Sequence, residues 1–352
     1  MKKEIRFTVG TNFDLEQIEH FIEINERYQD KKIASVYGSL STKEVNLASA
    51  RPNFRLGKAD RNTFEQYVKK ALAHNISIDY TANASMNMCI ADMYAAKEDL
   101  IDNFKYLESV GVKRVIVANP LLMELIADHT SLKIKASTIL GINHVNAVKY
   151  YADLGADRIC PDIYINRNIP LLKAVQSECE KYGMELELLV NEICFFGDVP
   201  CNNVLRGSCY THSSMGGNED KLFCGWPFDR CQRARAEHPE CMLKIPCVLP
   251  CHLEYYKEHT GISNFKISGR TNTKEYLLRT IGLYMDGTFE GSIEELFMLP
   301  QNTRSTTGQG ITLERLQEEG FFDKVLSTTK GCDYRCHTCQ YCDKVYEKLR
   351  FE

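Results

Sequence analysis

Eight short apolar segments, most of them separated by amphipathic helical patterns, constrain the fold of this 352-residue chain more than any other feature. The segments are rich in β-branched residues, which is typical of strands buried on both faces. They occupy residues 5–10, 32–38, 76–83, 112–119, 133–140, 156–163, 184–192 and 265–270.

The helical patterns between these segments cover residues 64–75, 100–112, 144–156 and 171–183, and a further one at 271–287 follows the last strand. Alternation of strand and helix predicts parallel βαβ units, and eight rounds predict an α/β fold that closes into a (β/α)8 TIM-like barrel. A doubly wound open sheet is the alternative. We assign the barrel to residues 1–290 and a C-terminal extension to residues 291–352.

One long insertion, residues 193–262, interrupts the alternation after the seventh strand. In a barrel it leaves from the carboxyl end of a strand, where active sites are built. The net charge of −4, the absence of a signal-peptide pattern and the absence of a long apolar run predict a cytoplasmic protein with no membrane partner.

Fifteen cysteines are unexpected in a reducing compartment, where disulfide frameworks are rare. Four of them crowd into a C-x(3)-C-x(2)-C-x(2)-C run near the C-terminus, and thiolates are the ligands that zinc and iron–sulfur clusters prefer. The run therefore predicts a metal site, either iron–sulfur or zinc, although it could also be a staple without catalysis. Its residues are Cys332, Cys336, Cys339 and Cys342.

A second group of eight cysteines lies between Cys194 and Cys251. Cys194 and Cys201 form a C-x(6)-C pair directly after the seventh predicted strand. We expect four metal ligands among the eight thiols, and we expect the others to pack beneath the long loop, since free cysteine is often buried.

The segment NEICFFGDVPC, the cysteine-rich insertion and GISNFKISGRTNTKEYLLRTIGLYMDG together resemble peptidase family U32. The resemblance covers residues 1–290, is strongest over 184–287, and extends to one bacterial clade whose chains end in a four-cysteine run. FKISGR resembles the family's lysine–isoleucine–glutamate–glycine–arginine signature. Lys266 and Arg270 are kept, whereas Ser268 replaces the glutamate.

The family name implies collagenase-like proteolysis, but better understood members resemble oxygen-independent hydroxylases. The resemblance implies a 4Fe–4S cluster held by four cysteines, prephenate as oxygen donor, and ubiquinone precursors or RNA as substrates. Cys194 and Cys201 match the family's first two ligands. The insertion is spaced differently from the family's, so the resemblance does not assign the other two ligands. We predict Cys209 and Cys247 for them, with Cys224 and Cys251 as alternates.

Polar residues at predicted strand ends are further candidates, because barrel enzymes place functional side chains there. Lys266 and Arg270 share one face of a strand and could hold an anionic substrate, or pair with a neighbouring strand. Glu192 is a candidate acid or base. Asn119 and Asp162 are weaker candidates, whose alternative role is capping the next helix or loop.

These features predict an iron–sulfur hydroxylase or related redox enzyme that acts on a small molecule, RNA or peptide. A peptidase is the first alternative, although the sequence contains neither H-E-x-x-H nor G-x-S-x-G. The second alternative is a non-catalytic, metal-bearing subunit that pairs with a related barrel. A homodimer or heterodimer of barrels is compatible with each function.

Overall fold

Eight parallel strands close into one barrel in chain order, and β8 pairs with β1. The computed structural model describes residues 4–41, 49–50, 56–84, 94–194, 226–297 and 311–350, without the side chains of 226–230 and 232. The closed barrel confirms the predicted (β/α)8 fold. Its strands are β1 Ile5–Gly10, β2 Lys31–Gly38, β3 Ser77–Ala82, β4 Arg114–Val117, β5 Lys133–Ala136, β6 Ala156–Ile159, β7 Glu185–Leu189 and β8 Asn264–Ile267.

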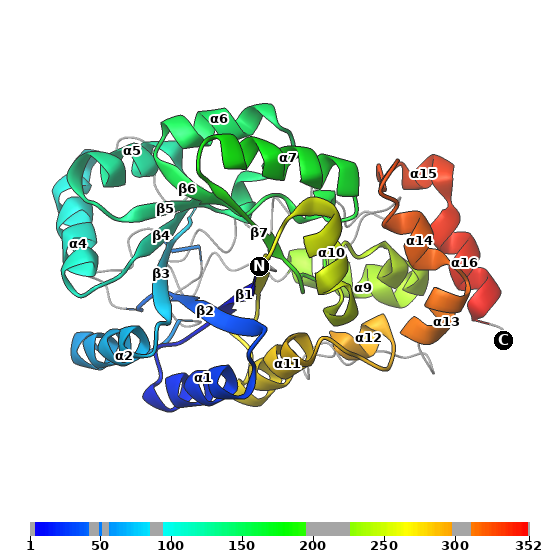
Figure 1. Cartoon of the computed structure of the whole chain (residues 1–352), viewed down its shortest axis with the longest axis horizontal. Coiled ribbons are helices and arrows are strands. Elements are labelled where there is room, and N and C mark those ends of the chain that lie inside the picture. The colour runs from blue at the N-terminus through cyan, green and yellow to red at the C-terminus, as the bar shows by residue number, and fades with distance from the viewer. Residues whose placement is uncertain are drawn as a thin grey trace.

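Helices surround the barrel, as Figure 1 shows. Asp14, Asp60 and Asn119 each begin one of them, because their side-chain oxygens accept free amides of the first turn. The barrel helices are α1 Leu15–Arg27, α2 Arg61–Ala73, α4 Lys97–Ser109, α5 Pro120–His129, α6 Asn146–Asp153, α7 Ile169–Lys181, α10 Leu253–Thr260 and α11 Lys274–Asp286.

The predicted insertion follows β7 and, in its described part, contains α9 Trp226–Glu237, η4 Pro239–Lys244 and η5 Pro250–His252. α10 then completes the seventh strand–helix unit. The C-terminal extension contributes α12 Ile293–Leu296, α13 Leu313–Glu318, α14 Phe321–Val325, α15 Cys336–Cys339 and α16 Tyr341–Leu349. Helices α14 to α16 stand beside α9 and α10 on one side of the barrel (Figure 1).

Several strands end earlier than the sequence patterns predict. β5 stops at Ala136, and Ser137 turns the chain into the short helix η2 Thr138–Leu140 by accepting the Ile139 amide. Asp162 acts in the same way before η3 Ile163–Ile165. Local side-chain to backbone bonds of this kind compete with strand pairing, so apolar residues beyond them leave the sheet.

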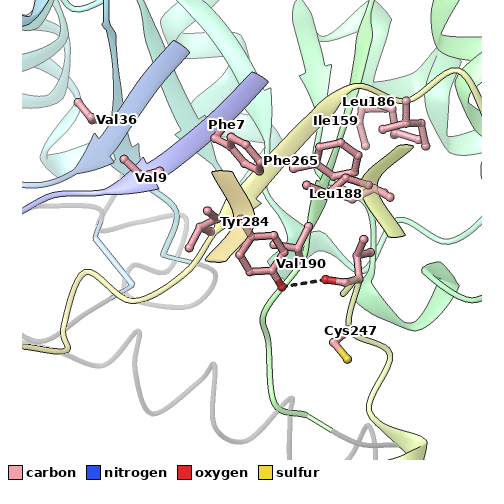
Figure 2. Packing of buried hydrophobic residues seen from close by; sticks show 14 of the residues in the cluster. Phe7, Val9, Val36, Ile159, Leu186, Leu188, Val190, Cys247, Phe265 and Tyr284 are labelled. Atoms are coloured by element: carbon pink, nitrogen blue, oxygen red, sulfur yellow. Dashed lines mark hydrogen bonds between the residues drawn. The ribbon is translucent and has the colours of Figure 1, made fainter. Parts of the chain in front are cut away.

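The outward faces of the strands form the apolar core beneath the helices. Phe7, Phe265 and Leu188 lie opposite one another on β1, β8 and β7, as Figure 2 shows. The Tyr284 ring of α11 lies 6.3 Å from the Phe7 ring, and its hydroxyl donates to the Val248 carbonyl at 2.8 Å. Each such side chain contributes about 1.5–3 kcal/mol by leaving water.

The inward faces are polar and charged, which corrects the expectation that both faces are apolar. Lys135 of β5 lies 2.6 Å from Asp79 of β3 and 2.9 Å from Glu187 of β7, and all three side chains are fully buried. These strands are not neighbours, so the bonds cross the barrel interior. Arg114 pairs with Asp79 at 3.2 Å and Arg158 pairs with Glu187 at 3.3 Å.

No helix within the described ranges combines the length and the apolar character that crossing a membrane requires.

We expect Lys135→Met to lower the free energy of unfolding by about 3–5 kcal/mol, because it leaves two buried carboxylates without the cation between them. Chemical denaturation measures the loss. The control is Lys149→Met, which breaks the exposed 2.6 Å pair with Asp153 on α6 and should change stability little. Equal denaturation midpoints for the two variants would show that the contacts of Lys135 with Asp79 and Glu187 do not stabilise the barrel more than an exposed ion pair does.

Stability should also fall at acidic pH. Burial raises the pKa of Glu185, but the guanidiniums of Arg158 and Arg6 outweigh it and bring the pKa down to about 2. A carboxyl with a lowered folded-state pKa stabilises the fold above its ordinary pKa and loses that contribution as pH falls towards the folded value. Urea midpoints should therefore decline from about pH 5 towards pH 2. Glu185→Gln should show a shallower decline, and an unchanged slope would refute this assignment.

Candidate functional site

Lys266 presents a cation at the carboxyl end of the barrel. Its ammonium lies 4.1 Å from the centre of the Tyr37 ring, and the residue is 6% exposed. Among the described residues it forms neither a hydrogen bond nor an ion pair. Glu187 interacts with this ammonium electrostatically, but a cation–π contact is weaker than an ion pair in the same surroundings, so part of the desolvation cost of Lys266 is not offset by its described contacts.

Arg270 approaches the same tyrosine from the loop that follows β8. Its guanidinium carbon lies 6.0 Å from the Tyr37 ring centre, and Nη1 donates to Thr81 at 2.6 Å and to Ser39 at 3.3 Å. Gly10 permits this approach, because a Cβ at position 10 would lie 2.8 Å from the Arg270 backbone. The predicted pair Lys266 and Arg270 therefore approaches one shared ring, that of Tyr37.

The loop that carries Arg270 is fixed to the end of β7. The Asn191 amide donates to the Ser268 carbonyl at 3.0 Å and accepts from the Ser268 amide at 2.6 Å. Strand β8 ends at Ile267, so Arg270 lies beyond the strand. The prediction that Lys266 and Arg270 share one face of a strand is therefore wrong. The backbone at Gly269, with φ of 136°, redirects the chain instead.

Glu192 and Cys194 continue from this anchored point. Glu192 is half-buried, and the Cys194 thiol lies 3.9 Å from its carboxylate. Cys194 packs against a small cluster that contains Cys160, Tyr164 and Leu189. Cys201 and Cys209, with the alternate Cys224, lie outside the described residues. The cluster contact therefore locates one predicted ligand of this group beside the barrel mouth.

The thiol of Cys160 is a feature that the sequence patterns did not single out. Burial raises its pKa to about 11, although the nearby Lys266 lowers it. Cys160 is therefore a protonated thiol at neutral pH, and it lies close enough to interact electrostatically with Lys266. Only its position at the end of β6 could have indicated this.

Cys247 belongs to the main hydrophobic core near Tyr284 (Figure 2). Burial raises its pKa to about 11, against the lowering effect of Arg167. The alternate ligand Cys251 is an exposed residue, although partial burial of its thiol raises its pKa as well. Cys247 thus packs in a different cluster from Cys194.

The four cysteines of the C-terminal run lie against the barrel side. The Cys332 amide donates to the Arg167 carbonyl at 3.0 Å, and Cys342 packs on the main core. Cys336 begins the short helix α15, and Cys339 ends it in an exposed position. Within the described ranges, no group of three or more His, Cys, Asp or Glu side chains is arranged to hold a metal ion.

Asn119 and Asp162, which the sequence offered as functional candidates at strand ends, cap the helices that follow them. Asn119 accepts the Leu121 amide at 3.0 Å and caps α5, and Asp162 accepts the Tyr164 amide at 3.1 Å. Arg167 is a functional candidate that sequence reasoning missed. It is 3% exposed and lies between the barrel and the C-terminal run.

Fold and site together define a (β/α)8-barrel protein with a cationic site at the carboxyl ends of its strands. The family model described as Peptidase family U32 matches residues 35–296, which are most of the chain. The protein therefore belongs to peptidase family U32. The C-terminal cysteine run lies beyond the matched residues.

Two archaeal relatives and one solved structure are similar to this chain. The uncharacterized protease MJ1657 of Methanocaldococcus jannaschii is 25% identical over 303 residues, covering 85% of this chain and 82% of that protein. The uncharacterized protease MJ0090 of the same organism is 22% identical over 66% of this chain and 58% of its own length. The U32 peptidase Mk0906 shares 18% identity over 65% of this chain and 85% of its own, with a TM-score of 0.47.

Thiol reactivity should separate exposed from core cysteines. We expect Cys339 to be alkylated at least about a hundredfold faster than Cys179, because a buried thiol reacts only after local opening. Cys179 is fully buried on α7, and burial raises its pKa to about 12. Mass spectrometry of peptides from the native, metal-stripped protein at pH 8 gives both rates. Comparable rates would contradict the packing described for α7.

Proposed function

We propose that this protein is an enzyme that binds an anionic group of its substrate between Lys266 and Arg270, and that it hydrolyses a peptide bond beside that group. The observation that carries the proposal is the buried Lys266 ammonium, which lies against the Tyr37 ring and, among the described residues, forms no ion pair. A bound carboxylate would supply the missing charge. A peptide C-terminus or an acidic side chain has that chemistry.

The neighbouring groups support anion binding. Arg270 adds a second cation, with hydroxyl groups of Ser39 and Thr81 as its described hydrogen-bond partners. Two cations against one aromatic face can bind a carboxylate more firmly than either alone, because the site is shielded from water. The carboxyl end of a barrel is also where this fold builds active sites.

Glu192 is the proposed general base. In the proposed step its carboxylate takes a proton from water, and the water oxygen attacks the carbonyl carbon of the substrate. The C–N bond then breaks, and the proton passes from Glu192 to the leaving amine. Lys266 would stabilise the negative charge that develops on the carbonyl oxygen.

The comparisons favour peptide hydrolysis over hydroxylation, because both archaeal relatives carry the name protease and the family is a peptidase family. Two thiols near the barrel, those of Cys160 and Cys247, are poor candidates for a nucleophile, since burial raises the pKa of each to about 11. A base acting through water, rather than a thiolate, is therefore the hydrolytic mechanism that we propose.

Oxygen-independent hydroxylation is the second candidate, and the cysteines are the observation that favours it. Cys194 of the C-x(6)-C pair lies beside the barrel mouth, near Cys160 and Leu189. A 4Fe–4S cluster would be held by the predicted ligands Cys194, Cys201, Cys209 and Cys247, and it would supply electron transfer or, with an open iron, Lewis-acid chemistry. In the described structure Cys247 packs in a different hydrophobic cluster from Cys194, so these two thiols are not yet gathered at one site. Prephenate, itself a carboxylate, would match the cations of the mouth.

The C-terminal run is proposed as a separate metal site. Cys332, Cys336, Cys339 and Cys342 offer four thiols within one short segment, as zinc or an iron–sulfur cluster requires. Metal binding would draw these sulfurs closer together than the described structure has them. Cytoplasmic location and pairing with a related barrel subunit likewise remain proposals.

We expect Lys266→Met to reduce hydrolysis of peptides with an acidic or free carboxyl group at least about a hundredfold, because it removes the charge that holds that group. Quantification of peptide products by mass spectrometry measures the effect. The control is Lys274→Met, which removes an exposed lysine that pairs with Glu16 at 2.7 Å. Full activity of Lys266→Met, or equal loss in the control, would exclude the proposed subsite.

Glu192→Gln should abolish hydrolysis while leaving peptide binding intact. Binding measured by fluorescence anisotropy separates these two effects. If no peptide substrate is cleaved by the wild-type chain, hydrolysis is excluded and the hydroxylase candidate takes its place.

Anaerobic purification with iron, sulfide and zinc analysis tests the two proposed metal sites. Replacing Cys194 and Cys201 by serine should remove only the metal of the barrel mouth, whereas replacing Cys336 and Cys339 should remove only that of the C-terminal run. Loss of all metal in either double variant would show one shared centre. Absence of metal from the wild-type protein would exclude both.

A further inference from the structure

Asn191 lies where the two halves of the candidate site meet. It is the second residue after β7, it directly precedes Glu192, and it is 5% exposed. Its side-chain amide donates to the Ser268 carbonyl at 3.0 Å and accepts from the Ser268 amide at 2.6 Å. Ser268 is two residues before Arg270 on the loop after β8. One side chain therefore connects the segment of the proposed base to the segment of the anion-binding guanidinium.

These two hydrogen bonds begin where the pairing of β7 with β8 ends. The two strands pair as far as Leu189 and Lys266, and the Val190 amide still donates to the Lys266 carbonyl at 3.0 Å. The backbone groups of Ser268 lie beyond this point. The Asn191 amide offers one donor and one acceptor in a single plane, which is the combination that one backbone N–H and one C=O require.

The position of Arg270 depends on this fixed point. Directly after Ser268 the chain turns at Gly269, where φ is 136°, and the next side chain then reaches Thr81 at 2.6 Å. A loop held at both of its ends restricts the guanidinium more than a loop held at one end, since fewer backbone conformations remain open to it. Loss of the Asn191 bonds would also leave backbone groups of Ser268 without their partner.

We propose that Asn191 is a positioning residue, which holds Arg270 at a fixed place relative to Glu192, so that a carboxylate bound at the mouth brings the neighbouring peptide bond to the base. This inference rests on the function proposed above. Asn191 acts through the backbone of Ser268 and not on the substrate. Because both bonds go to backbone groups, they do not depend on which side chain occupies position 268.

Asn25 of α1 provides a matched control, because it makes the same pair of bonds elsewhere in the barrel. Its amide donates to the Ile33 carbonyl at 2.9 Å and accepts from the Ile33 amide at 2.7 Å. Ile33 lies in the amino half of β2, away from the carboxyl end where the site lies. Asn→Asp at either position removes the donor and places a carboxylate against a carbonyl. Only the change at position 191 should affect the site.

Steady-state cleavage of a peptide with a free C-terminal carboxylate tests the proposal, with products quantified by mass spectrometry. At neutral pH we expect Asn191→Asp to lower kcat/KM at least about tenfold, with a higher KM and a lower kcat, because both the anion site and the base lose their alignment. The amidated form of the same peptide should show a smaller change in KM, since it lacks the carboxylate. Asn25→Asp should keep the wild-type kcat and KM.

The pH profile separates positioning from a general effect on the fold. A protonated carboxyl group has one donor and one acceptor, as the amide has, so it can make both bonds to Ser268. The activity of Asn191→Asp, divided by that of the wild type at the same pH, should therefore rise as the pH is lowered from about 8 to about 5. The same ratio for Asn25→Asp should stay constant.

The outcomes distinguish this inference from the proposed function. Cleavage by the wild type together with unchanged kcat and KM in Asn191→Asp would overturn only the role of Asn191, and so would an equal loss of activity in Asn25→Asp. A wild-type chain that does not cleave the peptide would exclude the proposed function, and this inference with it. If Asn191→Asp does not fold, Asn191→Ala removes both bonds without adding a charge, and its kcat and KM decide the question.

Discussion

The ammonium of Lys135, held between the carboxylates of Asp79 and Glu187, is the interaction on which the barrel interior depends. Barrels of this kind are usually filled by layers of branched apolar side chains. Here the interior contains ions, and each ion needs a partner because water is excluded. The bonds link strands that are not neighbours, so they fix the barrel across its width as well as around its circumference.

This network also forms the floor of the candidate site. Glu187 interacts electrostatically with Lys266 as well as with Lys135 and Arg158, so the cation of the mouth is coupled to this set of charges. Lys266 and Arg270 both approach the ring of Tyr37. A cationic site of this kind suits the recognition of an anionic group better than nonspecific apolar binding.

The family assignment and the site contribute different information about function. Membership of peptidase family U32 rests on the match to residues 35–296 and favours a hydrolase. The cysteine-rich insertion and the C-terminal run would be unnecessary for hydrolysis by a base and water.

The fold followed from the sequence, and the sequence also proposed where the site would lie. Alternating strand and helix patterns determined the barrel, and FKISGR identified Lys266 and Arg270, because backbone periodicity and local motifs are written in neighbouring residues. Strand ends were less predictable: residues 138–140 are apolar, but Ser137 turns them out of the sheet. Ligands such as Cys201 and Cys209 lie outside the described residues and remain sequence predictions.

The sequence by itself determined the fold class, the insertion after the seventh strand and the clustering of thiols. Only the tertiary structure decided that the barrel interior is charged, that Lys266 and Arg270 both approach Tyr37, and that Arg167 contacts the C-terminal run. These contacts join residues far apart in the chain, such as Arg167 and Cys332. Periodicity shows which face of a strand a residue occupies, but partners across a closed barrel are set by register and packing.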